Sequence, residues 1–364
     1  MPLQYSAAKL SLLRTPAKRR KLTPTQQAYI KASKRSTGVT EAKRPHAQRL
    51  EVKDYNVQLD YQLQRGSVLV AVNTVLDTQW SETTTLHSRY ADHNPLTHKG
   101  KIVDQKTRED ILFHFRGLST EYGAKVLSYR RTLPELVTVG QLYSIFSEAG
   151  PTFVDKQLEL LIRQGQLRKF IITNAAPVIS RSLQKFHTGK ITYGFENVEV
   201  VARAETYHAL LKEHRTPTAS KFNQFLTANP TALFVGPEHF DTAELDELVN
   251  LGFVTLTSNH LNEIETHQYS ISYPGCGTFL KLINQGRAWL VKTLQSNKFH
   301  ELLEDTLWSK YEGRTRAGVC QLKNFHRPFY GYDLNWILAD ALGAGVVEVF
   351  NTPVGRGWRL TGKV

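Results

Sequence analysis

The sequence predicts a helix-rich α+β fold, because one pattern of helix, glycine and strand recurs three times along the chain. The three stretches are "FVDKQLELLIRQGQLRKFIIT", "DTAELDELVNLGFVTLTS" and "YDLNWILADALGAGVVEVF". Each has apolar residues at helical spacing, then a glycine that ends the helix, then a β-prone run. The glycines, Gly165, Gly252 and Gly343, lie 87 and 91 residues apart. A recurring period indicates three units of one architecture.

Each unit is expected to continue into a β-hairpin. In the third unit "VVEVF" turns through "NTPVGRG" into "WRL". In the second, residues 253–257 return through Tyr269, Ile271 and Tyr273, and in the first "LRKFIIT" returns through Ile191, Tyr193 and Phe195. Shorter helical segments precede the units: "VGQLYSIF", "ASKFNQFLTANP" and "KFHELLEDTLW". Helix, turn, helix, strand, loop and strand is the order of a winged helix.

Two of the repeated helices carry start signals. Asp241 with Glu244 forms a capping-box pattern, and Asp333 is a suitable N-cap before Leu334. The sequence thus predicts three tandem winged-helix domains, at 103–201, 202–295 and 296–364.

A basic arm precedes them. Residues 1–50 hold twelve Lys or Arg residues and one acid, Glu41, whereas the other 314 residues hold 34 bases and 32 acids. The arm has too little apolar content to offset its ordering entropy, so we expect it to be disordered. Its block Lys18, Arg19, Arg20 and Lys21 suits a nuclear localisation signal. The acid-poor start also fits a mitochondrial presequence, and a third interpretation is a solvated tail.

Residues 51–102 are harder to interpret. Val57, Leu59, Tyr61 and Leu63 alternate with polar residues, and the apolar run "SVLVAVNTVL" follows. This pattern is typical of strands or of a segment docked on the body. We expect loop or docked strands here.

The repeats resemble a known family. The stretches "QLYSIFSEAGPTFVDKQLELLIRQGQLRKF", "ELVNLGFVTL" and "YPGCGTFLKLINQGRAWLVKTLQSNKFHELL" are similar to the family historically named serine/threonine-protein kinase 19, over roughly residues 103–364. The resemblance implies tandem winged helices that bind DNA in the nucleus. It also implies a place in transcription-coupled nucleotide excision repair, with repair or transcription proteins as partners. This chain departs from the family at Gln295, Ser296 and Asn297, where some positions are basic in the family.

No enzyme motif accompanies the kinase name. The chain has no HRD, no DFG and no GxGxxG, and "GCG" at 275–277 is followed by no Walker lysine. "FHELLED" is not the HExxH motif of zinc hydrolases. Two cysteines, Cys276 and Cys320, cannot build a zinc site or a disulfide framework. We therefore expect no enzyme, no cofactor, no metal, no small-molecule substrate and no membrane span.

The segment after Pro274 is the best candidate for DNA contact. Gly275 and Gly277 predict a turn into a helix, and the alternative is that the helix N-terminus binds a backbone phosphate. On that helix an apolar face is expected (Phe279, Ile283, Gly286, Leu290, Leu294) opposite a polar one (Lys281, Gln285, Ala288, Lys292, Gln295). The candidate DNA-binding residues are Lys281, Arg287, Lys292, Lys298, Lys310, Arg314, Arg316 and Lys323, with Lys156 and Arg163 in the first unit.

Acids on the helices that would normally enter a major groove argue against ordinary base readout. Asp241 and Asp246 mark that helix in the second unit, and Asp333 and Asp340 mark it in the third. Such helices are expected to pack against protein instead. The sequence therefore predicts a nuclear, non-enzymatic scaffold that binds the backbone of duplex DNA. The alternatives are a protein–protein adaptor of a nuclear complex and, disfavoured, a protein kinase.

Overall fold

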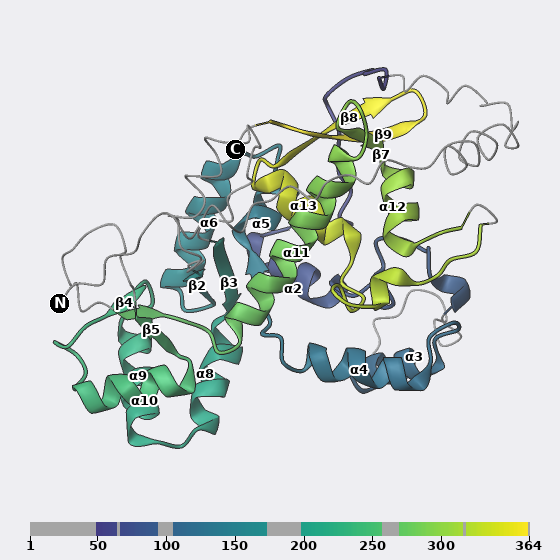
Figure 1. Cartoon of the computed structure of the whole chain (residues 1–364). Helices are drawn as coiled ribbons and strands as arrows, with labels where there is room; N and C mark the ends of the chain where they lie inside the picture. The colour runs from purple at the N-terminus through teal and green to yellow at the C-terminus, as the bar shows by residue number, and fades with distance from the viewer. Residues whose placement is uncertain are drawn as a thin grey trace, which may run out of the picture. The chain divides into compact units, whose positions relative to one another are not determined.

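The computed structural model describes residues 49–63, 66–93, 105–172, 198–256, 269–315 and 318–362. Contacts divide the chain into two parts, residues 1–48 and residues 49–364, and every described residue belongs to the second part. Residues 1–48 of the basic arm, with the block at 18–21, thus lie outside the described residues. The described part is a helix-rich α+β structure with three small antiparallel sheets of three strands each (Figure 1).

The first sheet has one strand before a pair of consecutive helices and two strands after it. Its elements are β1 (Val137–Thr138), α5 (Val139–Ile145), α6 (Pro151–Arg163), β2 (Leu167–Ile172) and β3 (Val198–Arg203). The strand order is β1-β3-β2, so the last strand is central and pairs with both neighbours. The return strand expected over residues 191–195 lies outside the described residues. The expected domain boundary at 201 falls inside β3.

The second sheet repeats this plan with the order β4-β6-β5. Its elements are α8 (Ala204–Glu213), α9 (Pro217–Ala228), β4 (Phe234–Val235), α10 (Thr242–Leu251), β5 (Val254–Leu256) and β6 (Tyr269–Ile271). The predicted cap of α10 is present, since the Asp241 amide donates to Glu244 Oε2 at 2.9 Å.

The third sheet has the order β7-β9-β8. Its elements are α11 (Cys276–Gln295), β7 (Glu301–Leu303), α12 (Glu304–Glu312), α13 (Leu334–Gly343), β8 (Val347–Thr352) and β9 (Gly355–Leu360). The predicted N-cap of α13 is confirmed, because Asp333 Oδ1 accepts from the Asn335 amide at 3.0 Å. α11 packs against α13, β7 and β9. The boundary expected at 295 therefore separates α11 from elements on which it packs.

The sequence did not reveal the short strands β1, β4 and β7. A helix was expected to begin before Glu301, but residues 301–303 form a strand in which Leu302 faces Trp358 of β9. Two or three residues are too few to show a period of two. The third strand of each sheet supplies the pairing that defines them.

The N-terminal part of the body agrees with the expectation of loop or docked strands over residues 49–63 and differs from it in the segment that follows. Residues 49–63 are extended and docked, with a bridge between Asp54 and Asn351. The apolar run that follows is a helix, α2 (Val68–Thr78), whose N-cap Ser67 accepts from the Val70 amide. α2 packs against β1, α5 and α6. A short apolar run that is buried on several sides cannot be told from a strand by its sequence periodicity.

A second, smaller core lies outside the three sheets. It involves α3 (Gln105–His114), α4 (Thr120–Arg130) and the turn η3 (Lys323–Phe325). Its buried residues are Tyr90, Ile111, Leu112, Phe115, Val126, Leu127, Leu322 and Phe325. Segments from both ends of the body therefore complete it.

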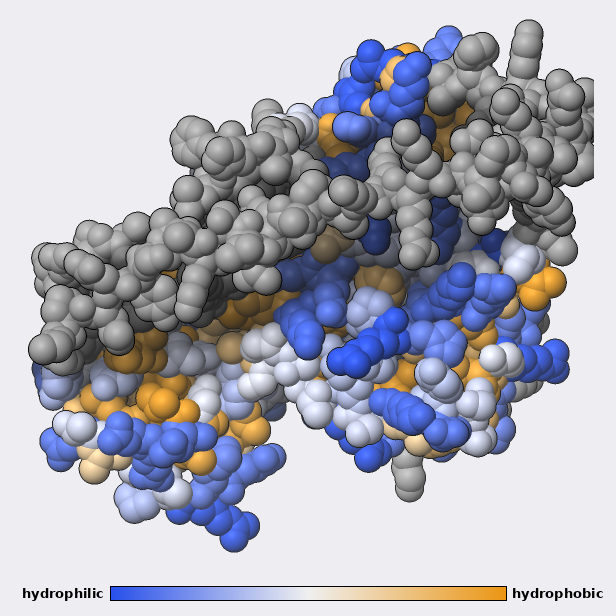
Figure 2. Space-filling model, in the orientation of Figure 1, coloured by the Kyte–Doolittle hydropathy of each residue, from blue (hydrophilic) through white to orange (hydrophobic). Residues whose placement is uncertain are grey.

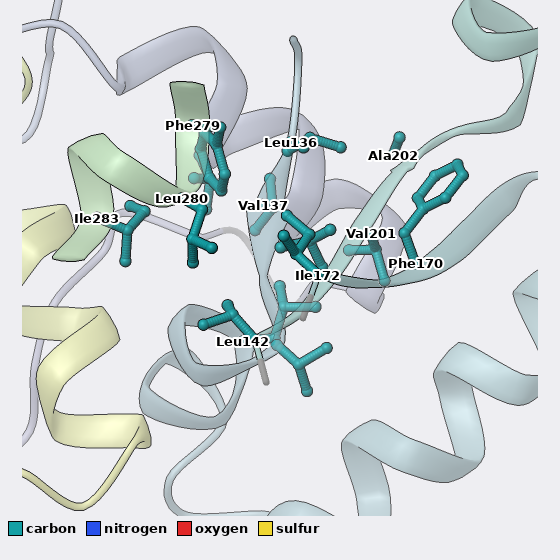
Figure 3. Packing of buried hydrophobic residues seen from close by; sticks show 14 of the residues in the cluster. Leu136, Val137, Leu142, Phe170, Ile172, Val201, Ala202, Phe279, Leu280 and Ile283 are labelled. Atoms are coloured by element: carbon teal, nitrogen blue, oxygen red, sulfur yellow. The ribbon is translucent and has the colours of Figure 1, made fainter. Parts of the chain in front are cut away.

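The main core is continuous from the first sheet into α11. Figure 3 shows Val137, Phe170 and Val201 of that sheet together with Phe279 and Ile283 of α11. All five are at most 2% exposed. α11 is therefore fixed by burial along one face.

The prediction of which glycine ends each repeated helix is confirmed in two units and corrected in the third. Gly165 and Gly252 adopt the left-handed conformation, with φ of 69° and 81°. In the third unit Gly345 does so (φ 69°), and Gly343 lies inside α13. A Cβ at Gly343 would lie 1.8 Å from the carbonyl oxygen of Gly140 in α5. Gly343 is therefore required by helix packing and does not end the helix.

Candidate nucleic-acid interface

The two predicted faces of α11 are confirmed. Its apolar face is buried, with Leu290 and Leu294 at 0% exposure, and Gly286 lies against Ile337 of α13. On the opposite side Lys281, Ala288 and Lys292 are exposed. α11 contains no acidic residue over its 20 positions. Lys281 and Lys292 are eleven residues apart, so they share one face about 16 Å apart along the axis.

A turn places the start of α11. The Cys276 amide donates to the carbonyl of Tyr273 at 3.0 Å, and Gly275 has a φ of 79°. A Cβ at position 275 would lie 3.1 Å from the carbonyl oxygen of Thr132, which favours glycine there. The predicted turn into a helix is confirmed. Phosphate binding at the helix N-terminus stays a prediction.

Arg287 does not share the exposed lysine face. Its Nε donates to Asp340 Oδ2 at 2.6 Å and its Nη2 to Asp340 Oδ1 at 2.9 Å. The two side chains are 11% and 1% exposed. Burial acts to lower the pKa of Arg287, but the Asp340 carboxylate outweighs it and raises that pKa. The prediction that Arg287 contacts phosphate is therefore corrected, because Asp340 already pairs with its guanidinium in a buried bidentate contact.

Two further exposed lysines lie beyond the end of α11. Lys298 is exposed, and its Nζ lies 5.3 Å from the ring centre of Phe299. Lys310 of α12 is also exposed, with its Nζ 3.5 Å from Ser296 Oγ. The structure thus brings Lys310 to the C-terminal end of α11. Within the described residues, Lys281, Lys292, Lys298 and Lys310 have no carboxylate partner.

Arg314 is partly neutralised by a buried acid. Its Nε donates at 2.7 Å to Glu312, which also accepts from Arg89 at 2.6 Å. Burial acts to raise the pKa of Glu312, but the hydrogen bonds from Arg89 and Arg314 lower it below the ordinary value. Lys323 is exposed, and its stem packs over Gly313. Arg316 lies outside the described residues.

The first unit offers a weaker cationic face. Lys156 and Arg163 are exposed on α6, seven residues apart and therefore on one side of it. Arg163 Nε donates to Glu159 at 2.7 Å in an exposed pair. Lys156 is the freer of the two cations.

The helices of the second and third units that carry acids behave differently from each other. α13 packs along α5, and its Asp333 and Asp340 are 0% and 1% exposed, as expected for a helix packed against protein. The expectation is wrong for the acidic side of α10. Asp241 and Asp246 are exposed there, and only Leu245 and Leu248 of that helix are buried. An amphipathic helix buries its apolar stripe and leaves its charges in water.

One buried group has the residue types of a hydrolase triad but not its geometry. Ser81 Oγ donates to Asp333 Oδ2 at 2.9 Å, and His87 Nε2 lies 2.8 Å from the same oxygen. A nucleophile needs a hydrogen bond to its base, with the acid behind the base. Here the carboxylate lies between the serine and the histidine. The group joins the segment 81–87 to the start of α13 and is structural.

Arg168 of β2 is a residue that sequence reasoning passed over. It is 2% exposed, and its Nη2 donates to the carbonyl of Ala232 at 3.0 Å. Alternation along "LRKFII" could have indicated burial of one of the two bases. Hydropathy alone assigns arginine to the surface.

On the face drawn in Figure 2, hydrophilic residues cover much of the described part, with smaller hydrophobic areas between them. No described helix is long and apolar enough to cross a membrane. Both cysteines are free. Fold and surface together define a helix-rich α+β protein with small sheets and an exposed lysine face.

The comparisons give the family. Residues 109–360 match the family model described as inactive serine-threonine protein kinase 19, Stk19, and the chain belongs to this family. It is also similar to a protein of Schizosaccharomyces pombe (strain 972 / ATCC 24843) named serine/threonine-protein kinase mug51. The two are 27% identical over 239 residues, which is 63% of this chain and 68% of that protein. The description of the family as inactive agrees with the missing HRD and DFG motifs.

Proposed function

We propose that this chain is a nuclear, non-catalytic scaffold that binds the backbone of duplex DNA. Its partners would be transcription or repair proteins, and its process transcription-coupled nucleotide excision repair, both by family resemblance. The observation that carries DNA binding is the lysine face of α11. Lys281, Lys292 and Lys298 are exposed and lack carboxylate partners in the described residues. The first two lie on α11, which contains no acidic residue, and Lys298 comes just after it. Lysines of this kind neutralise phosphates without reading bases.

We also propose that the three sheets and their helices are winged-helix domains. Each sheet has a short first strand and two later strands that pair as a hairpin. All three sheets have the same strand order, with the last strand central. The packing of α2 on β1, α5 and α6 supports its assignment as the first helix of the first domain. The packing of α11 on α13, β7 and β9 supports the same place for α11 in the third.

The burial of α13 bears on the mode of binding. In a helix-turn-helix, the second helix usually enters the major groove. α13 occupies the corresponding place in the third unit, but its face toward α5 is closed, with Gly343 against Gly140. DNA would therefore meet the lysine face, and affinity would depend little on sequence.

A DNA-binding assay on residues 49–364 tests the proposal. This fragment lacks most of the basic arm, which could bind DNA without any fold, but keeps residues 49–63 and α2, which contribute to the core. We expect duplex binding at low salt with a log–log salt slope of about −0.9 per phosphate contact. Reversing Lys281 and Lys292 to glutamate should weaken binding and flatten the slope by about two units.

The control is Lys221→Glu, an exposed lysine of α9 outside the lysine face. It should bind DNA nearly as wild type does. If the fragment does not bind duplex DNA at low salt, or the double reversal binds as well as wild type, DNA binding by this face is wrong.

The second candidate is a protein–protein adaptor without DNA contact. It is favoured by the acidic side of α10, where Asp241 and Asp246 are exposed and suit a basic partner surface. A kinase is the disfavoured alternative. Purified protein should show no ATP-dependent phosphate transfer, and transfer abolished by one point mutation in residues 49–364 would contradict this.

A further inference from the structure

A cavity of about 670 Å³ opens beside β2 of the first sheet and the first two helices of the second unit. Its wall comes from four places: the end of α6, the start of β2, one side of α8 and the end of α9. Apolar residues form part of it, among them Leu167, Ala204 and Leu226. A volume of this size suits a small organic molecule.

Arg168 in this wall is a buried cation that pairs with no carboxylate among the described residues. It is 2% exposed, and its Nη2 donates to the Ala232 carbonyl at 3.0 Å. Its Nε is buried and has no hydrogen-bond partner in the described part of the chain. The guanidinium carbon lies 6.0 Å from the ring centre of Tyr207, whose hydroxyl is neutral at pH 7 and whose pKa burial raises further. Burial lowers the pKa of Arg168.

A buried charge without an opposite charge is costly, so an anion is the group that this wall lacks. Among the described residues no carboxylate pairs with Arg168. The nearest acid in the wall is Glu205, an exposed residue of α8.

The rest of the wall adds positive charge and hydrogen-bonding groups. Lys212 of α8 is exposed at the cavity, and Arg163 lies at its rim in a pair with Glu159. His208 Nδ1 is hydrogen-bonded to Asn223 Oδ1, which joins α8 to α9 across the wall. Because Glu159 already pairs with Arg163, Arg168 and Lys212 remain against one acid of the wall, Glu205, and the wall is positive.

We propose that this cavity binds a small organic phosphate. The phosphate would lie at Arg168 and Lys212, since arginine recognises phosphate oxygens with its planar fork and lysine adds a point charge. The organic body would lie along Leu167, Ala204 and Leu226. A dianion suits this wall better than a single carboxylate, because two cations, Arg168 and Lys212, line it. The site is separate from the proposed DNA surface.

The experiment uses the full chain and adenosine 5′-monophosphate as the probe, with adenosine and inorganic phosphate as comparison ligands. Calorimetry and thermal unfolding are measured in parallel, because a ligand of the folded state raises Tm. We expect the monophosphate to bind and raise Tm, adenosine to do neither, and inorganic phosphate to bind more weakly. No DNA is present, so the outcome is independent of the proposed DNA binding.

Two variants test the residues. Lys212→Glu changes an exposed side chain and should weaken monophosphate binding by at least about tenfold. Arg168→Met removes the unpaired cation, so its Tm without ligand should not fall and its response to the monophosphate should vanish. Lys221→Glu, an exposed lysine of α9 outside the cavity, should bind as wild type does.

Failure of the monophosphate to bind would overturn the proposal, as would undiminished binding by Lys212→Glu. Adenosine binding as tightly as its monophosphate would overturn the phosphate contact. Inorganic phosphate binding as tightly would overturn the organic body. If Arg168→Met unfolds, Lys212→Glu still decides.

Discussion

The guanidinium of Arg287 and the carboxylate of Asp340 form a buried bidentate pair, with N–O distances of 2.6 Å and 2.9 Å. Thr138 Oγ1 donates to the same carboxylate at 2.7 Å. The Asp340 side chain therefore joins α11, α13 and the strand β1, which lie far apart in the sequence. Thr138 also caps α5, since its Oγ1 accepts from the Gln141 amide at 3.1 Å. One aspartate thus holds the packed faces of the first and third units together.

Breaking this pair should destabilise the fold and leave the lysine face intact. Asp340→Ala leaves a buried arginine unpaired, so unfolding by urea should show a loss of about 3–5 kcal/mol. The double variant Arg287→Met with Asp340→Leu should recover much of this loss, because no buried charge remains unpaired. DNA affinity of the folded double variant should match wild type. A single variant as stable as wild type would contradict the buried pair, and a large loss of DNA affinity in the folded double variant would return Arg287 to the DNA surface.

Glu312 should make stability depend on acid pH. Hydrogen bonds from Arg89 and Arg314 hold its pKa below the ordinary value of 4.5, despite burial. A lowered folded pKa stabilises the protein above the unfolded pKa, and the stabilisation is lost as pH falls through the folded pKa. Glu312→Gln should therefore cost about 3 kcal/mol at neutral pH. Its difference from wild type should shrink below pH 4.5.

Denaturation measured from pH 3 to 7 checks this (about four units, which span the titration of a carboxyl group). The control is Glu121→Gln, an exposed carboxylate paired with Lys125 on α4, where little change is expected. A difference between wild type and Glu312→Gln that stays constant across the range would show that Glu312 does not titrate as argued.

Two helical glycines should respond to alanine in opposite ways. At Gly343 a Cβ would lie 1.8 Å from the Gly140 carbonyl oxygen, so Gly343→Ala must push α13 from α5 and should cost at least about 1–3 kcal/mol. At Gly277 in the first turn of α11, nothing lies within 4 Å of such a Cβ. Gly277→Ala should be neutral or stabilise by up to about 1 kcal/mol, because alanine favours helix. Thermal unfolding of both variants measures this. Equal stability of the two would contradict the close approach.

The block Lys18, Arg19, Arg20 and Lys21 should direct nuclear entry, because it is a dense basic cluster outside the body of the protein. Replacing the four residues with alanine should move a fluorescent fusion out of the nucleus. The melting temperature of the body should not change, since these residues belong to another unit. A fusion of the alanine variant that stays in the nucleus would contradict the hypothesis. Import of the intact chain into mitochondria would favour a presequence instead.

The sequence by itself determined the elements whose signals are local. Apolar residues at helical spacing placed the buried face of α11 and the helices α6, α10 and α13, and the caps at Asp241 and Asp333 were read correctly. Alternation located β2, β5 and both strands of the third hairpin. Charge counting placed the excess of bases in the arm, and similarity of separated stretches gave the family. Each of these depends on a few neighbouring residues, which sequence spacing records.

Tertiary structure decided what depends on residues far apart in the chain. Gly343 looked like a helix end, but contact with Gly140 places it inside α13. The apolar run before Thr78 looked like a strand, but burial against β1, α5 and α6 makes it helix. Arg287 and Lys292 look alike in sequence, yet Asp340, 53 residues from Arg287, removes only the first from the surface. Charge is a local property of sequence, whereas its exposure depends on packing between distant segments.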